Sequence, residues 1–470
     1  MWFANHPFSE VKIVESVLRY LEEHRRRFVA ELVELLRIPS VSAKREHRAD
    51  CTRAAEYVQS RFQELGLDAV LCATPGNPIV LARGHAGADK PTVLVYGHYD
   101  VQPAEPLDLW HSPPFEPIIE EGNLYARGAT DDKGQMYAHV KAAEAMIRTG
   151  AGLPVNVIYL IEGEEEIASV NLEEFIASRR DELRCDVAVI SDSSQYAPGI
   201  PALCYGLRGI CAVEIRVEGA RQDLHSGQFG GAIANPLQVL CEMISKMKDP
   251  QGRVAVPGFY DDVLELEEWE RKAFASLDWN DEAFRQSLGV EQLYGEEGYT
   301  TLERKWARPT LELNGIFGGY AGEGSKTVLP AWAGIKITMR LVPHQNYKTM
   351  ADRFEAFVRR LAPPTVRVSV IRQGGGNPIA IPRTAPYVDV ALDALRRGFG
   401  AEPVFMREGG SIPIVSAIKD LLGVDTMLLG FGLPDDNCHA PNEKFNLDDY
   451  QCGIATAAWF MHLCSNSVSH

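Results

Sequence analysis

The sequence lacks several features that would each assign the protein to a class. Its nine cysteines form no Cys-x-x-Cys pair, which argues against a disulfide framework or a thiolate zinc knuckle and indicates a reducing compartment. There is no apolar run long enough to span a bilayer and no apolar signal core at the N-terminus. Acidic residues outnumber basic ones, and the net charge of -17 opposes nonspecific nucleic-acid binding. We therefore expect a cytoplasmic protein without a membrane or nucleic-acid partner.

What the chain does contain is an alternation of apolar strands and helical patterns. Its 470 residues, 46% of them hydrophobic, are enough for more than one domain. The run Thr92 to Tyr96 is apolar and β-branched, as in a strand buried on both faces, and similar runs follow at 155–160 and 186–191. Helical periodicity separates them, most clearly at 133–149. This alternation predicts an α/β fold with a mostly parallel sheet and helices on both faces.

The pattern changes near residue 209 and changes back near residue 376. Strands with one polar face are expected at 211–218 and 331–341, a helix at 347–361, and an insertion of helices at 258–310. The glycine run 374–376 is interpreted as a break in the chain, after which the α/β pattern resumes. The sequence therefore predicts an α+β domain at 209–376, inserted between two parts of a larger domain at 1–208 and 377–470.

Acidic and histidine side chains follow the predicted strands of the larger domain. His98 and Asp100 stand where the first strand ends, Glu164 to Glu166 follow the second, and Asp192 follows the third. Ligand sites in open α/β sheets lie outside the carboxyl ends of the strands. Each residue also has an ordinary interpretation: a structural histidine, a solvated acidic turn, or, for the pair Asp131-Asp132, a cap of the next helix. However, unneutralised carboxylates so close to an apolar strand would repel one another, and a bound cation would relieve that repulsion.

With His439 added, two histidines and three of these carboxylates can form one ligand set. Such a set suits zinc, manganese or cobalt better than magnesium or copper. If two ions lie about 3.5–4 Å apart, one carboxylate must bridge them. The sequence thus predicts a two-metal hydrolytic site.

The motifs that surround these residues resemble those of the M20 family of metallopeptidases, close to its cytosolic nonspecific dipeptidase and carnosinase branch. The resemblance covers nearly the whole chain, from Arg37 to Glu443. The matching motifs are Gly97-His98-Tyr99-Asp100-Val101-Gln102-Pro103, Arg127-Gly128-Ala129-Thr130-Asp131-Asp132-Lys133-Gly134, Glu162-Gly163 before Glu165-Glu166, Asp223-Leu224-His225-Ser226-Gly227, Arg340-Leu341-Val342-Pro343 and Glu408-Gly409-Gly410-Ser411-Ile412-Pro413.

The resemblance implies that the larger domain is catalytic, and it implies a role for each matching residue of that domain. Asp131 would bridge two divalent ions, with Zn²⁺ expected first and Mn²⁺ or Co²⁺ as alternatives. His98 and Asp192 would complete one metal site, and Glu166 and His439 the other. The Asp131–Asp132 peptide is expected to be cis. Glu165 matches the family's general base, and Asp100 would orient His98.

For the inserted domain, the resemblance implies a ferredoxin-like lid that also forms a homodimer. His225, and with it Thr327, would reach the metal centre of the other subunit. Arg340, Gly410 and Ser411 would hold the carboxyl end of a small peptide substrate. The expected activity is a dipeptidase that cleaves short peptides with a free C-terminal carboxylate. An N-acyl amino acid amidase of the same superfamily and a non-catalytic metal-binding protein remain as alternatives.

One position departs from the family pattern. Glu164 stands before the catalytic pair, where the relatives tend to carry an apolar residue, and the motif ends Ile167-Ala168-Ser169. The proposed ligands are unaffected, but the electrostatics of the pocket around Glu165 and Glu166 do not follow from the resemblance.

Overall fold

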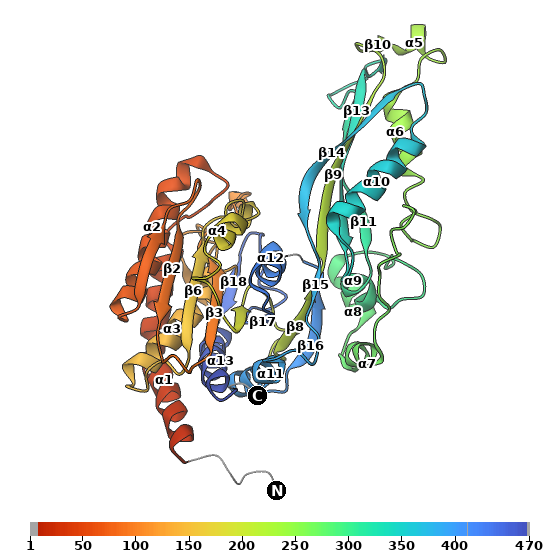
Figure 1. The fold of residues 1–470 in the computed structure, drawn as a ribbon. Coiled ribbons are helices and arrows are strands. Elements are labelled where there is room, and N and C mark those ends of the chain that lie inside the picture. Colours follow the sequence, from red (N-terminus) through yellow and green to blue (C-terminus); the bar gives the residue numbers. More distant parts are fainter. Residues whose placement is uncertain (1–7, 411, 468–470) are drawn as a thin grey trace. The chain divides into compact units, whose positions relative to one another are not determined.

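The computed structural model of the chain describes residues 8–410 and 412–467 (Figure 1). The described residues divide into two units. The first contains those of 1–205, 381–406 and 417–470, and the second those of 206–380 and 407–416. The predicted domain limits at 209 and 376 lie inside the long segment of the second unit. Residues 407–416 also belong to the second unit, which the sequence did not predict.

A nine-stranded mixed sheet is the centre of the first unit (Figure 1). Only its middle is parallel, through the pairs β6–β3, β3–β7 and β7–β17, whereas β1, β2, β8 and β15 pair antiparallel with their neighbours. The prediction of a mostly parallel sheet is therefore wrong outside the centre. Only β1 and β2 are joined by a short connection, and the other antiparallel pairs bring together strands that are far apart in the sequence. The strands, in sheet order, are β1 (Asp68–Cys72), β2 (Ile79–Gly84), β6 (Asn156–Glu162), β3 (Thr92–His98), β7 (Val187–Ile190), β17 (Thr426–Leu429), β8 (Ala202–Leu207) and β15 (Ile379–Ala380), with β16 (Val404–Glu408) paired to β8.

The central strands are buried on both faces, as their apolar sequences predict. Helix α3 connects β3 to β6 and helix α4 connects β6 to β7, so the two crossovers run in opposite directions along the sheet. Because such crossovers are right-handed, α3 and α4 lie on opposite faces. The helices of this part of the chain are α1 (Phe8–Leu36), α2 (Arg48–Glu64), α3 (Lys133–Arg148), α4 (Leu172–Ser178), α11 (Val388–Phe399), α12 (Pro413–Leu422) and α13 (Leu447–Ser465).

A small three-stranded sheet connects distant parts of the first unit. Strand β18 (Lys444–Asn446) pairs antiparallel with β5 (Asn123–Tyr125), which pairs with β4 (Ile118–Glu120). This pairing brings the segment that follows His439 beside the segment that precedes Asp131, although more than 300 positions separate them in the sequence.

The second unit is an antiparallel sheet in the order β11-β13-β9-β14, with helices packed against it. Its chain order, β9-α6-β11-β13-α10-β14, is the split βαβ arrangement of ferredoxin-like folds. Apolar side chains of β9, β13, α6 and α10 form one core, and Figure 1 shows both helices on the same side of the sheet. The elements are β9 (Gly209–Glu218), β10 (Leu224–His225), α5 (Ser226–Phe229), α6 (Pro236–Ile244), α7 (Glu268–Ser276), α8 (Asp281–Leu288), α9 (Thr301–Trp306), β11 (Thr310–Gly318), β12 (Val328–Leu329), β13 (Trp332–Leu341), α10 (Tyr347–Leu361) and β14 (Arg367–Gly376).

The break that was predicted at the glycine run 374–376 is not found. The run continues β14, which pairs with β9 as far as Ile210, with a bulge between Arg372 and Gly374. A Cβ on Gly375 would lie 2.2 Å from the carbonyl oxygen of Ile210, so the close approach of the two strands requires glycine there.

Candidate metal centre

The candidate site lies where the parallel strands of the first unit end. His98 is the last residue of β3, Asp192 follows β7, and Glu165 and Glu166 follow β6 in a short 3₁₀ turn (Glu165–Ile167). Because these strands are parallel neighbours, their carboxyl ends meet at one edge of the sheet. Asp131 joins them from the loop before α3.

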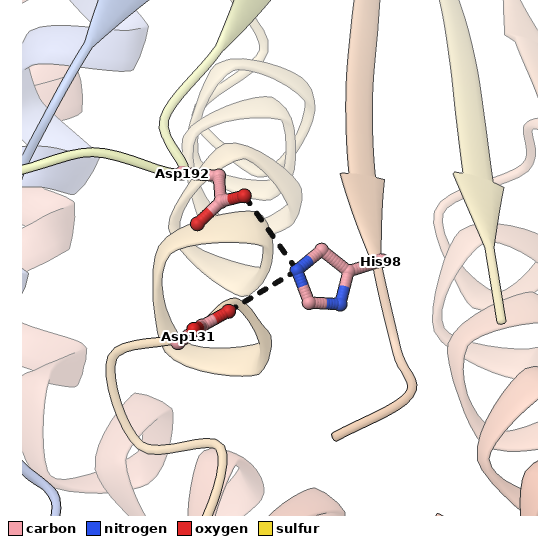
Figure 2. Close-up of side chains that lie close together, drawn as sticks. All are labelled: His98, Asp131 and Asp192. Carbon is pink, nitrogen blue, oxygen red and sulfur yellow. Dashed lines mark ion pairs between the residues drawn. The ribbon is translucent and has the colours of Figure 1, made fainter. Parts of the chain in front are cut away.

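The first group of candidate ligands is His98, Asp131 and Asp192. Figure 2 shows both carboxylates directed at the same ring nitrogen of His98. The Nε2 atom of His98 lies 3.3 Å from Oδ1 of Asp131 and 3.7 Å from Oδ2 of Asp192. His98 is fully buried, and Nε2 has no hydrogen-bond partner among the described residues. A buried nitrogen without a partner, facing two carboxylates, is the arrangement expected of a metal ligand.

The second group is Asp131, Glu166 and His439. The Nε2 atom of His439 lies 3.0 Å from Oδ2 of Asp131 and 3.3 Å from Oε2 of Glu166. These two carboxylates raise the pKa of His439 to about 10. Asp131 belongs to both groups and directs one oxygen to each histidine, which is the geometry of a bridging ligand.

The acidic residues of the site are close enough together that bound cations would stabilise them. Burial, and then repulsion from neighbouring carboxylates, raises the pKa of Glu165 to about 9 and also raises the pKa values of Glu166 and Asp192. Divalent cations would stabilise the ionised forms of these acids. Two imidazoles and three carboxylates are donors that zinc, manganese and cobalt accept. The residues present therefore fit a pair of divalent cations.

Asp100 connects His98 to the acidic turn. Its carboxylate oxygens accept hydrogen bonds from the backbone N–H groups of Glu165 and Glu166, each at 3.2 Å. The Nδ1 atom of His98 lies 3.0 Å from the carbonyl oxygen of Asp100 and 3.5 Å from its Oδ1. Asp100 is therefore in a position to fix both the ring of His98 and the backbone that presents Glu165 and Glu166.

The ordinary interpretations of the acidic residues do not hold. The side chain of Asp132 makes no capping bond to α3 and instead accepts a hydrogen bond from the backbone N–H of His98 at 3.2 Å. The Asp131–Asp132 peptide is cis, which confirms the expectation from the resemblance.

Glu164 is buried and accepts hydrogen bonds from the backbone N–H of Asn77 and from Asn171 Nδ2, at 3.1 and 2.6 Å. Glu164 is thus directed to two asparagines and is absent from both ligand groups.

Glu443 is a residue of this site to which the sequence analysis assigned no role. It is fully buried, forms an ion pair of 2.7 Å with Arg127, and accepts the backbone N–H groups of Gly128, Thr130 and Asp131 at 2.9, 3.0 and 3.1 Å. One carboxylate therefore fixes the loop that presents the shared ligand. It stands four positions after His439, so the same contact links the loops of two candidate ligands.

Gln102 also contributes without having been predicted. Its Nε2 donates to Oε2 of Glu166 at 2.7 Å. Gln102 belongs to the motif that begins at Gly97, and its place in that motif was the only signal that could have identified it.

The predicted substrate and dimer residues lie in the second unit. His225 and Thr327 are exposed and adjacent, because β10 pairs with β12 and the N–H of Ser226 donates to the carbonyl of Thr327 at 3.0 Å. Arg340 is half-buried on β13, and burial lowers its pKa. Gly410 is exposed, and Ser411 lies outside the described residues.

The fold and the paired ligand groups are those of a metallopeptidase, and comparison with known proteins identifies the family. Residues 94–462 match the model of peptidase family M20/M25/M40. The chain therefore belongs to that family, as the sequence motifs predicted, and is a metallopeptidase.

Individual relatives are similar over nearly their whole length. The chain is 33% identical to a Cys-Gly metallodipeptidase of Schizosaccharomyces pombe, over 96% of this chain and 98% of the relative. It is 33% identical to the human β-Ala-His dipeptidase, over 97% and 94%. Among solved structures, an M20 family metallo-carboxypeptidase of Sulfolobus solfataricus has a TM-score of 0.86 at 33% identity, over 93% and 99%.

Two further observations concern the expected surroundings of the protein. The cysteines of the described residues form no disulfide bond with one another. Within residues 8–410 and 412–467, the helices are too short or too polar to cross a membrane.

Proposed function

We propose that this protein is a two-metal dipeptidase, which hydrolyses the amide bond of dipeptides or short peptides with a free C-terminal carboxylate. One observation carries the proposal: Asp131 is shared between two complete groups of candidate ligands. The similarity of the whole chain to two kinds of dipeptidase supports the substrate class.

In this proposal, His98 and Asp192 would hold one cation, Glu166 and His439 would hold the other, and Asp131 would contribute a carboxylate oxygen to each. Zn²⁺ is proposed first because both groups contain an imidazole, with Mn²⁺ or Co²⁺ as alternatives. When bound, such a pair of cations supplies a water that is acidic enough to ionise near neutral pH and polarises the scissile carbonyl.

The protein's own groups perform the proton transfers. Glu165 belongs to neither ligand group, so its carboxylate remains available to accept a proton from the attacking water and donate it to the leaving amine. Asp100 keeps Glu165 in place because its carboxylate accepts a hydrogen bond from the backbone N–H of Glu165. The turn is half-buried, which reduces its contact with bulk water and strengthens the interactions within the site.

The carboxyl end of the substrate is proposed to bind Arg340, Gly410 and Ser411. The guanidinium of Arg340 is planar and can donate two parallel hydrogen bonds to a carboxylate. A requirement for a free carboxylate near the scissile bond would restrict the enzyme to short peptides.

The second unit is proposed to act as lid and dimer contact, with His225 and Thr327 completing the site of the other subunit in a homodimer. In support, both residues are exposed at the same two-stranded tip, where their side chains are accessible to a partner. A cytoplasmic location is part of the proposal, since the cysteines of the described residues form no disulfide bond.

A substrate panel on protein reloaded with Zn²⁺, Mn²⁺ or Co²⁺ tests the proposed function. We expect hydrolysis of Ala-Gly and Gly-Leu, and little or none of the N-acetyl and N-succinyl derivatives of the same amino acids. Activity only on the acyl substrates would instead indicate an amidase. No turnover of any substrate by fully loaded protein would favour a non-catalytic metal-binding protein.

A further inference from the structure

The second unit contains a cavity of about 460 Å³ whose lining is strongly basic. Its volume falls in the range of small-molecule sites. Six basic residues belong to the lining. Arg304 and Lys305 are on α9 and Arg340 is on β13, whereas Arg208 directly precedes β9 and Lys248 and Arg308 lie in connecting segments.

Only two acidic side chains, Glu296 and Glu312, are found in this lining among the described residues. Glu296 accepts a bidentate pair from Arg308, with both N–O distances at 2.8 Å. Glu312 pairs with Lys248 at 3.1 Å. Six basic against two acidic side chains give the cavity an excess of positive charge, which favours an anionic ligand.

The charge of a neighbouring basic group acts on the ionisation of two residues of this lining, Arg208 and Lys305. Burial, and then the charge of Arg340, lowers the pKa of Arg208 to about 10. Burial, and then the charge of Arg208, lowers the pKa of Lys305. The ammonium of Lys305 is positioned 4.9 Å from the ring centroid of Trp279 and 4.8 Å from that of Phe284. Like charges gathered in a cavity are stabilised when an anion binds between them.

This cluster adjoins the proposed site for the substrate carboxylate. Arg340 lines the same cavity, and Nε of Arg208 donates to the carbonyl oxygen of Gly409 at 3.1 Å. A Cβ on Gly409 would lie 2.9 Å from Nη2 of Arg208 and 3.2 Å from the carbonyl oxygen of Lys305. The guanidinium of Arg208 and the backbone of Lys305 therefore pack against the turn that leads to Gly410, and both residues line the same cavity as Arg340. The cavity thus offers cations for a second anionic group beside the one assigned to Arg340.

We propose that Arg208 and Lys305 bind a second carboxylate of the substrate, on the side chain of its C-terminal residue, so that the enzyme prefers dipeptides ending in glutamate or aspartate. The inference rests on the proposed function, and it adds a specificity that the metal centre does not determine. A neutral side chain of the same shape lacks the negative charge that the basic lining attracts, which makes the preference measurable.

The test compares Ala-Glu with Ala-Gln, which are nearly the same shape and differ in one charge. With metal-loaded full-length protein, we expect kcat/KM for Ala-Glu to exceed that for Ala-Gln by at least about 10-fold, since hydrogen bonds to charged groups are the stronger kind. The preference should fall toward unity in Arg208→Gln and in Lys305→Gln, mainly through KM. Lys305→Arg keeps the charge and should retain most of the preference.

A matched control removes the same charge elsewhere in the second unit. Lys272 is on α7 with its side chain 75% exposed, and Lys272→Gln should leave the preference of the wild type unchanged. A wild-type ratio of one or less would overturn the inference, as would an unchanged ratio in both Arg208→Gln and Lys305→Gln.

Failure of the proposed function gives a different result. In that case neither dipeptide is hydrolysed, and calorimetric binding of Ala-Glu and Ala-Gln to the metal-loaded protein decides the inference. Tighter binding of Ala-Glu that is lost in Lys305→Gln supports the second carboxylate site, and equal binding of the two dipeptides contradicts it.

Discussion

At the scale of single residues, Glu165 is the side chain on which the proposed proton transfers depend. It stands beside Glu166 but belongs to neither ligand group. We therefore expect Glu165→Gln to lower kcat by about 10²–10⁴-fold, the usual contribution of a general acid–base, without loss of bound metal. Steady-state kinetics and metal content by mass spectrometry measure the two effects separately. Full activity of the variant would show that another group takes the proton.

Glu443 is predicted to stabilise the protein as well as the site. Glu443→Ala leaves the guanidinium of Arg127, which is 1% exposed, without its counter-ion and removes the acceptor of three backbone N–H groups. Removing one partner of such a buried pair costs about 3–5 kcal/mol. Urea unfolding of the metal-free protein should show a loss of this size.

The matching control is an ion pair on the surface. Glu182 is 49% exposed and pairs with Arg83 and Arg179, so Glu182→Ala should cost less than about 1 kcal/mol. Equal losses in Glu443→Ala and Glu182→Ala would show that the buried contact has no special role.

At the scale of elements, the start of α3 determines where Asp131 lies. Gly134 is in the first turn of this helix, and a Cβ there would lie 2.0 Å from the carbonyl oxygen of Ala129. Gly134→Ala must therefore displace the loop that carries Asp131, and we expect it to destabilise the protein by about 1–3 kcal/mol and to weaken Mn²⁺ binding. Denaturant unfolding and calorimetric titration measure both effects.

Gly315 on β11 provides the comparison, because a Cβ there meets no atom within 4 Å. Gly315→Ala should bind Mn²⁺ as the wild type does. Mn²⁺ affinity unchanged in Gly134→Ala would mean that the loop of Asp131 tolerates the displacement.

Periodicity predicted most elements, and its failures have physical reasons. The helix at 133–149 and the strand that ends at His98 are found as predicted, because each is long or buried enough to show its pattern. Strand β11 (Thr310–Gly318) was not predicted, since most of its side chains are exposed and its pairing with β13 defines it. The antiparallel flanks of the large sheet escaped prediction because pairing direction depends on tertiary contacts.

The candidate site was predictable to the extent that strand ends determine it. His98 and Asp192 follow apolar strands, so the rule for parallel sheets brought them together. His439 was included in the ligand set, but only the resemblance to a family assigned it to one of the two ions, because an irregular segment presents it. Glu443 and Gln102 act through contacts with backbone or with another ligand, and a single sequence contains no pattern for such contacts.

At the scale of the whole molecule, the proposed homodimer implies shared active sites. His225→Ala and Glu165→Ala subunits should each be nearly inactive alone. In a mixed dimer, one site combines an intact Glu165 with an intact His225 from the partner, so a 1:1 mixture should recover about a quarter of the wild-type activity. Native mass spectrometry verifies that mixed dimers form. If verified mixed dimers stay inactive, the site is complete within one chain.

The convergence of five side chains on two cations, with Asp131 between them, is the claim on which the proposed function depends. Anomalous diffraction from crystals grown with Zn²⁺ or Mn²⁺ tests it most directly. The account predicts two anomalous peaks about 3.5–4 Å apart, one beside His98 and Asp192, the other beside Glu166 and His439, with a carboxylate oxygen of Asp131 on each. A single peak, or two peaks with Asp131 in contact with neither, would contradict it.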